Sequence, residues 1–430
     1  MSSFQIIVLS VFGAFTVGGV LIFAFLVGSN SAATIGQVVV WGPLDETAFG
    51  SVLRELSEND GRLRQVTYVQ KNEDTYVQEL TNALAAGEGP DLFIMREDQT
   101  VSEGAKVFPL PYDQLSREDF RNTWAEAADP FLGPEGVIGI PFAVDPLVLY
   151  WNRDMLSTGG IAQPPAFWDE LPALVRAVTR RDDGGSIQKS AIAFGEYVNV
   201  NHTKTILGML ILQAGGRITA RDGNGQLTPA LASRVGETGR PSESALTFFT
   251  QFSNPSTENY TWNRSRAEAR VAFAQGDLAL YIGPASEEAL VRRLNPNLNF
   301  AIAPSVPQVR SSNIPINGGH AYAFAVPKAG ANPQGALTAA YLLAGADASR
   351  LFGVVYGFTS ARRDVLATPA EENEETFRRM ALLVRTWEDP EPKETDRIFR
   401  DMIESVTSGA ARPVEAIQRA EQSIRELTSI

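Results

Sequence analysis

Short apolar runs alternate with amphipathic segments along the first part of the chain. Residues 38–41 are apolar and end at a Gly-Pro pair, which predicts a buried strand. Residues 45–56 follow with apolar side chains at i, i+3, i+4 and i+7, the spacing of an amphipathic helix. A strand at 65–70, a helix at 74–86 and a strand at 91–95 repeat the alternation. Strands joined by helices of this length favour right-handed crossovers and an α/β sheet with parallel strands.

The pattern changes in the middle of the chain. Residues 141–146 begin and end with proline and interrupt the alternation before a new apolar run at 148–151. A helix is predicted at 168–179, and a strand at 321–326 with a helix at 333–344 restores the alternation. The chain therefore reads as two α/β regions separated by a crossing segment.

The Asp-Gly-Asn-Gly run at 222–225 offers two interpretations. It resembles the start of a calcium loop, but it lacks the further acidic ligands and the closing glutamate. A hairpin turn is the better interpretation. The last residues, with apolar positions at Val414, Ile417, Ile424 and Leu427, predict a C-terminal amphipathic helix.

Residues 4–27 form a run of 24 residues without a charge, long enough to cross a bilayer as a helix. We predict an uncleaved transmembrane anchor. A cleaved signal peptide with a small-x-small site at 31–33 and a buried core helix are the alternatives. No Lys or Arg precedes Arg54, so the positive-inside rule gives no orientation. The anchor and the signal peptide both place the body outside the cytoplasm.

Length and composition narrow the function classes. A body of roughly 390 residues exceeds the size at which a single core stops growing, so two lobes are expected. The net charge of −13 argues against nucleic acid as a partner, because nucleic acid requires basic patches. The chain has no cysteine and two histidines, which excludes disulfides, thiolate chemistry and His-rich metal sites. No metal and no cofactor are predicted.

Catalytic motifs are also missing from the sequence. It contains no P-loop, GxSxG elbow, HExxH or GxGxxG fingerprint, and no carboxylate spacing nominates a glycosidase pair. We predict a binding protein and not an enzyme.

Six segments resemble, in order, the extracellular solute-binding proteins of ABC importers, the maltose-binding-like family 1. They include a helix and Pro-Asp-led strand, a Gly-x-Pro crossing strand that leads into Tyr-Trp-Asn-Arg-Asp, and a helix after Pro-Pro-x-x-Trp-x-Glu. The six segments are residues 79–95, 136–156, 164–178, 211–216, 271–284 and 415–427.

The resemblance implies a type II periplasmic-binding-protein fold, in which two α/β lobes close on a ligand. Open α/β sheets bind ligands at the carboxyl ends of their strands, which agrees with a cleft between such lobes. The expected division is a short N-terminus at 1–3, the anchor or signal at 4–27, a linker at 28–36, lobe 1 at 37–143 plus 320–358, and lobe 2 at 144–319 plus 359–430.

The resemblance also implies a function. The protein is expected to capture a small solute, a sugar or oligosaccharide, and to deliver it to the permease subunits of an ABC importer. The alternative is a membrane-anchored sensor or adhesion module that uses the same binding fold. In both cases the body lies outside the cytoplasm, attached to the plasma membrane by the N-terminal helix or secreted if that helix is cleaved.

Three candidate ligand contacts lie near strand ends or the crossing segment. Trp41 ends the first strand, where its ring could stack on a sugar; the alternative is a core tryptophan. Asp98 follows the third strand on a loop where the family often places a polar contact; the alternative is a solvated carboxylate. Asp145 matches a crossing-segment position that is often acidic in the family; the alternative is a turn residue before Pro146.

Five further candidates come from the rest of the chain. His202 is a possible hydroxyl donor or helix cap, and Trp262 lies in a polar run that predicts an exposed ring, with core packing as the alternative. At most one of Tyr150 and Trp151 can face the ligand, because their strand should bury the other, and Trp151 is taken as the candidate. Tyr281 and His320 lie near strand ends beside the cleft.

The sequence departs from the maltose-type pattern at two positions. Met95 and Ala285 stand where an aromatic residue is expected. A sugar ligand is therefore what the resemblance implies, and not something that the residues establish.

Overall fold

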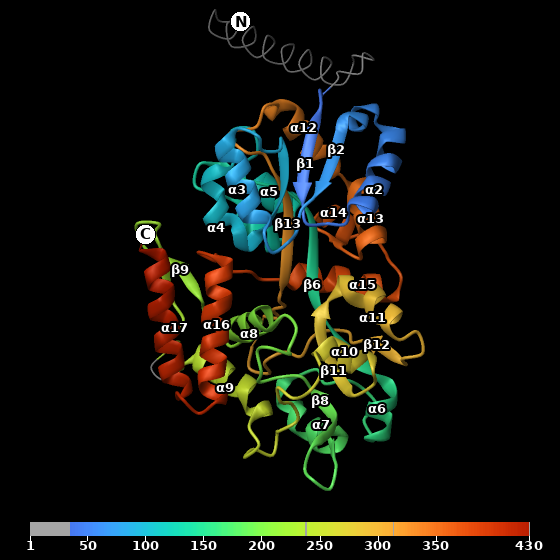
Figure 1. Ribbon diagram of the computed structural model, residues 1–430, viewed down its shortest axis with the longest axis vertical. Helices are drawn as coiled ribbons and strands as arrows, with labels where there is room; N and C mark the ends of the chain where they lie inside the picture. The colour runs from blue at the N-terminus through green and yellow to red at the C-terminus, as the bar shows by residue number, and fades with distance from the viewer. Residues whose placement is uncertain (1–34, 237–238, 313, 430) are drawn as a thin grey trace, which may run out of the picture.

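A computed structural model describes residues 35–236, 239–312 and 314–429 as two lobes stacked end to end (Figure 1). The apolar run at 4–27 lies outside these residues. Within the described ranges, no helix is both long enough and apolar enough to cross a membrane.

The first lobe begins with the predicted strand and helix alternation. Strand β1 (Val38–Gly42) pairs in parallel with β2 (Val66–Gln70) on one side and β3 (Leu92–Arg96) on the other. Helices α2 (Glu46–Asn59) and α3 (Tyr76–Ala86) connect them. These five elements confirm the expected α/β pattern. Strands β1 and β2 run towards the waist in Figure 1, and β3 is parallel to β1, so the carboxyl ends of all three face the second lobe.

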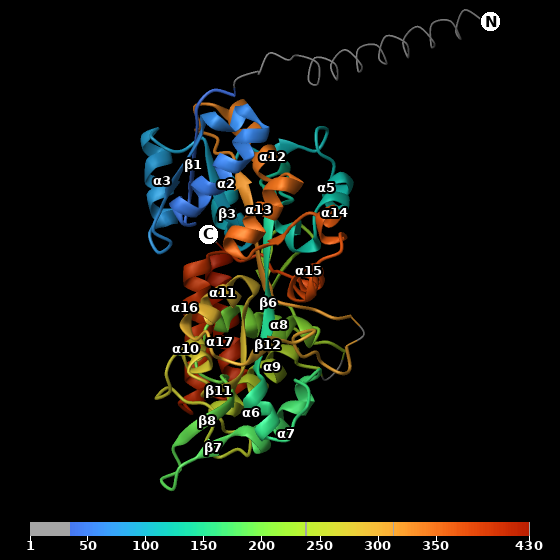
Figure 2. The same ribbon diagram turned by 90° about the vertical axis from the view of Figure 1, so that its right-hand side faces the viewer.

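One long strand joins the lobes. Strand β6 (Ile140–Asn152) passes through the waist without a break in both views (Figures 1 and 2). Up to Pro146 it pairs with β13 (Gly319–Ala325), and from Leu147 onward with β11 (Leu278–Pro284). The crossing is thus where the sequence predicts it.

The predicted interruption at 141–146 is wrong. Both prolines lie inside β6, because the ladder tolerates a missing N–H at a bulge or where the partner strand changes. Pro141 lies beside the register shift between Tyr322 and Ala323 of β13, and Pro146 is the last residue paired with that strand.

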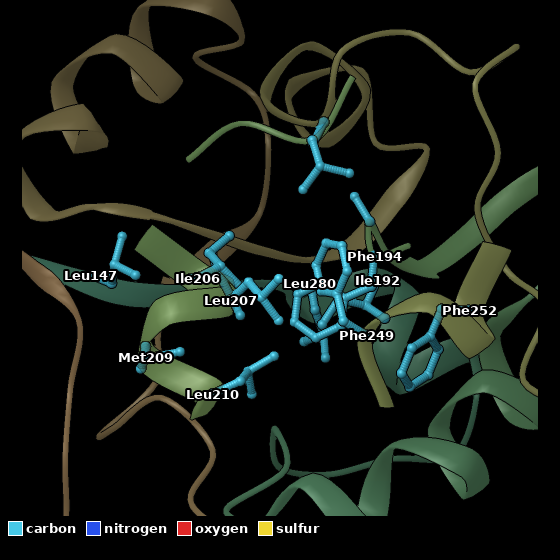
Figure 3. Close-up of a cluster of buried hydrophobic side chains, with 14 of the residues drawn as sticks. Leu147, Ile192, Phe194, Ile206, Leu207, Met209, Leu210, Phe249, Phe252 and Leu280 are labelled. Carbon is cyan, nitrogen blue, oxygen red and sulfur yellow. The ribbon is translucent and has the colours of Figure 1, made fainter. Parts of the chain in front are cut away.

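The second lobe continues the same sheet. Strand β8 (Ile187–Ile192) adds to β11 in parallel, and β7 (Arg180–Arg181) pairs with β8 at the edge. The main path of the ten-stranded sheet is β2-β1-β3-β13-β6-β11-β8-β7, and β12 (Phe300–Ile302) and β14 (Thr359–Ser360) also pair with β6. Figure 3 shows side chains of α8 (Thr203–Gln213), among them Leu207, close to Phe249 and Leu280 in the core of this lobe. The predicted hairpin turn at 222–225 is confirmed, since β9 (Thr219–Arg221) and β10 (Leu227–Pro229) pair antiparallel around it.

Two hydrophobic cores divide the chain. The first takes residues from 38–144 and 321–384, and the second from 147–306 and 380–424. Helix α15 (Glu372–Leu383) lies at the waist and contributes Met380 to the second core and Ala381 to the first. The first lobe is therefore built from two distant parts of the chain.

The other elements are short or cover the sheet. The first lobe also holds α4 (Thr100–Glu103), β4 (Leu110–Pro111), α5 (Arg117–Thr123), β5 (Gly136–Val137), α12 (Pro333–Leu343), α13 (Ala346–Tyr356), β14 (Thr359–Ser360) and α14 (Arg363–Leu366). The second holds α6 (Arg153–Thr158), α7 (Leu171–Val178), β7 (Arg180–Arg181), β9 (Thr219–Arg221), β10 (Leu227–Pro229), α9 (Pro241–Thr250), α10 (Ala269–Ala274), α11 (Glu288–Leu294), β12 (Phe300–Ile302), α16 (Pro392–Thr407) and α17 (Pro413–Thr428).

Candidate functional site

A pocket of about 580 Å³ lies between the lobes at the carboxyl end of β3. We call it the interlobe pocket. The first lobe contributes residues 96–98 and the start of β13. The second contributes side chains along α8, residues from the segment before that helix, and several residues between 385 and 396. The site therefore forms at strand ends, where open α/β sheets bind ligands.

An ion pair forms one wall of this pocket. Arg96 binds the carboxylate of Asp98 through two hydrogen bonds, Nε to Oδ1 at 2.8 Å and Nη2 to Oδ2 at 2.7 Å. Burial alone would raise the pKa of Asp98, but the charge and hydrogen bonds of Arg96 lower it to about 2. Asp98 is therefore a fixed anionic acceptor beside the pocket.

A hydrogen-bonded chain crosses from one lobe to the other. His320 Nδ1 lies 2.8 Å from Glu97 Oε1, and its Nε2 lies 3.1 Å from Thr205 Oγ1 on α8. The other oxygen of Glu97 accepts from the backbone N–H of Ala321 at 2.8 Å. Because Glu97 is buried and fully engaged, it fixes the orientation of the His320 ring.

The second lobe contributes a buried ion pair and an aromatic ring. Lys204 Nζ lies 2.5 Å from Asp389 Oδ2 and donates to Thr395 Oγ1 at 2.7 Å. Asp389 is fully buried, and this burial raises its pKa although Lys204 opposes the effect. Lys204 Nζ also lies 5.4 Å from the ring centroid of Trp387, whose ring stacks on Phe399. Trp387 is thus a fixed, half-buried ring in the wall of the pocket.

His202 begins α8 in a strained conformation. Among the described residues it is the one non-glycine with positive φ, at 57°. Its Nε2 lies 2.9 Å from Glu287 Oε1, and Glu287 also accepts from Arg270 and Tyr281. The side chain makes no capping hydrogen bond, so the capping alternative is wrong. The Glu287 network holds the imidazole in place beside the pocket.

Three of the eight candidate residues line the interlobe pocket: Asp98, His202 and His320. The other five do not: Trp41, Asp145, Trp151, Trp262 and Tyr281.

Two of these five are core residues. The expected exposure of Trp262 is wrong, since its side chain is completely buried and its Nε1 donates to Asn199 Oδ1 at 3.1 Å. Tyr281 is also buried, and its hydroxyl donates to Glu287. Through this bond Tyr281 helps to fix Glu287, which in turn holds the imidazole of His202 beside the pocket.

Two tryptophans are half-buried outside the pocket. Lys71 Nζ lies 3.7 Å above the ring of Trp41, so a cation already covers that ring. Trp151 packs against the second core.

Asp145 is buried at the waist and bound to the second lobe. It accepts hydrogen bonds from the N–H of Ser286 at 3.1 Å and from the Ser286 hydroxyl at 2.5 Å. Burial raises the pKa of Asp145 to about 6, although the bonds from Ser286 act in the opposite direction. Asp145 lies within β6, so the turn alternative is wrong, and the residue stabilises the waist.

Sequence reasoning missed Lys204, Trp387 and Asp389. One signal was available: Lys204 is the only charged residue in helix 203–213, whose other residues are mostly apolar. Trp387 lies in a polar, proline-containing run, which also predicts a partly exposed ring. In the described ranges, no group of three or more His, Asp or Glu side chains could hold a metal ion.

Comparison with known proteins gives one family and many similar folds. The sequence of residues 55–378 matches the family of bacterial extracellular solute-binding proteins. A binding protein from Brucella abortus (strain 2308) is 24% identical over 238 residues, which are 54% of this chain and 53% of the relative. The chain thus spans about half the length of the curated relatives it matches.

Two solved structures illustrate the shared fold. A solute-binding protein of an ABC transporter from Thermotoga lettingae, bound with α-D-tagatose, has a TM-score of 0.70 at 20% identity. The alignment covers 91% of this chain and 100% of that one. A receptor from Streptomyces glaucescens, solved unliganded and with acarbose, has a TM-score of 0.72 at 15% identity, covering 92% and 98%. At these identities the likeness establishes the two-lobed α/β fold.

Proposed function

The chain belongs to the bacterial extracellular solute-binding proteins, and from that premise we propose that it captures a neutral sugar or oligosaccharide in its interlobe pocket. The family is one of binding proteins, which agrees with the prediction that the chain is not an enzyme. Its location outside the cytoplasm follows from the family as well.

The charge balance of the pocket carries the proposal about the ligand. Four basic residues line it, Arg96, Lys204, Arg385 and Lys393, and four acidic ones, Glu97, Asp98, Asp389 and Asp396. A pocket with equal numbers of both signs offers no net attraction to an ion but supplies many hydrogen-bond donors and acceptors. Neutral polyhydroxyl solutes have both kinds of group on every ring. The half-buried ring of Trp387 adds an apolar surface on which a sugar ring can lie.

The ligands of similar folds support the same class of solute. Proteins of this fold have been solved with α-D-tagatose, with acarbose and with maltotetraose. The first of these is a solute-binding protein of an ABC transporter. We therefore propose that this chain delivers its solute to the permease subunits of such an importer. Within the pocket we propose Asp98, His202, His320, Lys204 and Trp387 as the ligand contacts.

Removal of the Trp387 ring tests the proposal. We expect Trp387→Ala to weaken sugar binding about 30-fold, or about 2 kcal/mol, as loss of a central aromatic contact does. Calorimetry would be run first with a panel of neutral sugars, amino acids, peptides and polyamines. A bound sugar should also raise the melting temperature and reduce the radius of gyration as the lobes close.

Trp41→Leu is the matched comparison, because Trp41 is a half-buried tryptophan outside the pocket. If the Trp41 variant loses affinity and the Trp387 variant does not, the ligand lies elsewhere. A charged solute that binds more tightly than every sugar contradicts the proposed ligand class.

We further propose that residues 4–27 anchor the body to the plasma membrane without cleavage. The anchor rests on the length and lack of charge of the segment. N-terminal sequencing of the exported protein should find the original N-terminus. A new terminus at Thr34 would mean that a signal peptide is removed.

A further inference from the structure

We propose that the preferred ligand is an unbranched oligosaccharide of three or more units, and that its chain passes beneath Lys393 into a second compartment. This inference rests on the proposed function and adds the length of the ligand. The second compartment, which we call the outer compartment, has a volume of about 430 Å³ and lies against β3, α3 and α4 of the first lobe.

The two hollows lie side by side and share three lining residues. Arg96, Pro392 and Lys393 line both of them. Each volume falls within the range of about 300–1,000 Å³ that is typical of small-molecule sites. A single sugar ring would leave most of the two hollows unfilled, whereas a chain of rings would occupy both.

Lys393 bridges the lobes where the two compartments meet. It lies in the first turn of α16, whose apolar face packs in the core of the second lobe. Its Nζ donates to the backbone carbonyl of Asp74 in the first lobe at 2.6 Å. This exposed lysine of the second lobe is thus bound to the first lobe where the two compartments adjoin.

Arg96 forms the opposite side of this junction. Its Nη2 lies 2.7 Å from Asp98 in the interlobe pocket, and its Nη1 lies 3.9 Å from Glu73 in the outer compartment. The guanidinium therefore presents N–H donors to both compartments. A hydroxyl-rich chain that crosses the junction would meet Arg96 on one side and Lys393 on the other.

The outer compartment matches the interlobe pocket in its electrostatics. Its basic residues are Arg96, Lys106 and Lys393, and its acidic ones are Glu73, Glu103 and Glu391. Lys106 is bound to Glu103 at 2.8 Å and to Thr81 at 2.8 Å, so this pair is already neutralised. A neutral ligand with many hydroxyl groups is therefore suited to both compartments.

Affinity as a function of ligand length tests the inference. Calorimetry with the full chain and α- and β-linked gluco-oligosaccharides of one to four units should show at least a tenfold gain from the disaccharide to the tetrasaccharide. Glu73→Gln should weaken the tetrasaccharide at least fivefold more than the disaccharide. Its side chain is 78% exposed, so the fold should tolerate the change, which circular dichroism would check. Trp387→Ala should weaken all bound lengths by a similar factor.

The outcomes separate the two proposals. If a sugar binds but its affinity does not increase beyond one or two units, the inference about length is wrong and the proposed function stands. If length matters but Glu73→Gln affects all lengths equally, the outer compartment is not where the added units bind. If no sugar binds, neither in the panel of neutral sugars nor among the gluco-oligosaccharides, the proposed function fails, and this inference fails with it.

Discussion

Replacing Lys204 by methionine is expected to lower the free energy of unfolding by about 3–5 kcal/mol. Methionine keeps most of the length of the side chain but removes the ammonium group that neutralises Asp389. The carboxylate of Asp389 has no exposed surface, and its Oδ2 lies 2.5 Å from Lys204 Nζ. Its remaining side-chain partner is the hydroxyl of Thr395, so the variant leaves a buried charge without a counterion.

Denaturant unfolding of the purified variant measures this loss. Lys328→Met is the matched control, since Lys328 is exposed and donates to a backbone carbonyl; its cost should stay within about 0.5 kcal/mol. The double variant Lys204→Met/Asp389→Asn should recover part of the loss, because it removes the buried charge as well. A single variant as stable as wild type would mean that Asp389 is not charged in the folded protein.

Replacing Asp145 by asparagine is expected to remove a decline in stability between about pH 4 and pH 6. The folded pKa is about 6, above the value of about 3.9 for an exposed aspartate. The folded state then holds a proton that the unfolded state has lost, so the free energy of unfolding falls as the pH rises through this window. A shift of this size corresponds to about 3 kcal/mol over the complete titration, of which about 2 kcal/mol falls between pH 4 and pH 6. Asparagine imitates the protonated carboxyl group and does not titrate.

The measurement is the difference in unfolding free energy between variant and wild type at several pH values. We expect this difference to move in favour of the asparagine variant by about 2 kcal/mol from pH 4 to pH 6, and to level off below about pH 3 and above about pH 7. Because all other titrating groups are common to both proteins, any constant cost of the substitution cancels. Parallel profiles across the window would show that Asp145 titrates alike in the folded and unfolded states.

Local patterns predicted the first lobe well. The elements from β1 to β3 each have a periodicity of their own, and the structure places all five within a few residues of the expected positions. The long strand β6 was predicted less well. Whether a proline fits in a strand depends on the partner strand, which belongs to a part of the chain more than a hundred residues away.

The site was predicted only in part, for the same physical reason. Asp98 follows strand β3 and His320 lies at the start of β13, and strand ends mark the cleft in this class of fold. The partner of Lys204 lies 185 residues further along the chain, and no local pattern connects the two. Trp262 was misjudged because its polar neighbours suggest a loop, whereas the tertiary structure folds that loop over its ring.

The divided first lobe has a consequence for how the protein matures. Its strand β3 pairs with β13, and the contact from Glu97 to Ala321 spans 224 residues. During synthesis the chain from 147 to 306, which holds most of the second core, emerges before the strand that completes the first. Strand pairing between residues so far apart in the sequence slows folding. Until the partner strand arrives, the edge of the sheet is unpaired and can bind other chains. We expect the nascent first lobe to be the part that requires chaperone protection, although it is the first to be made.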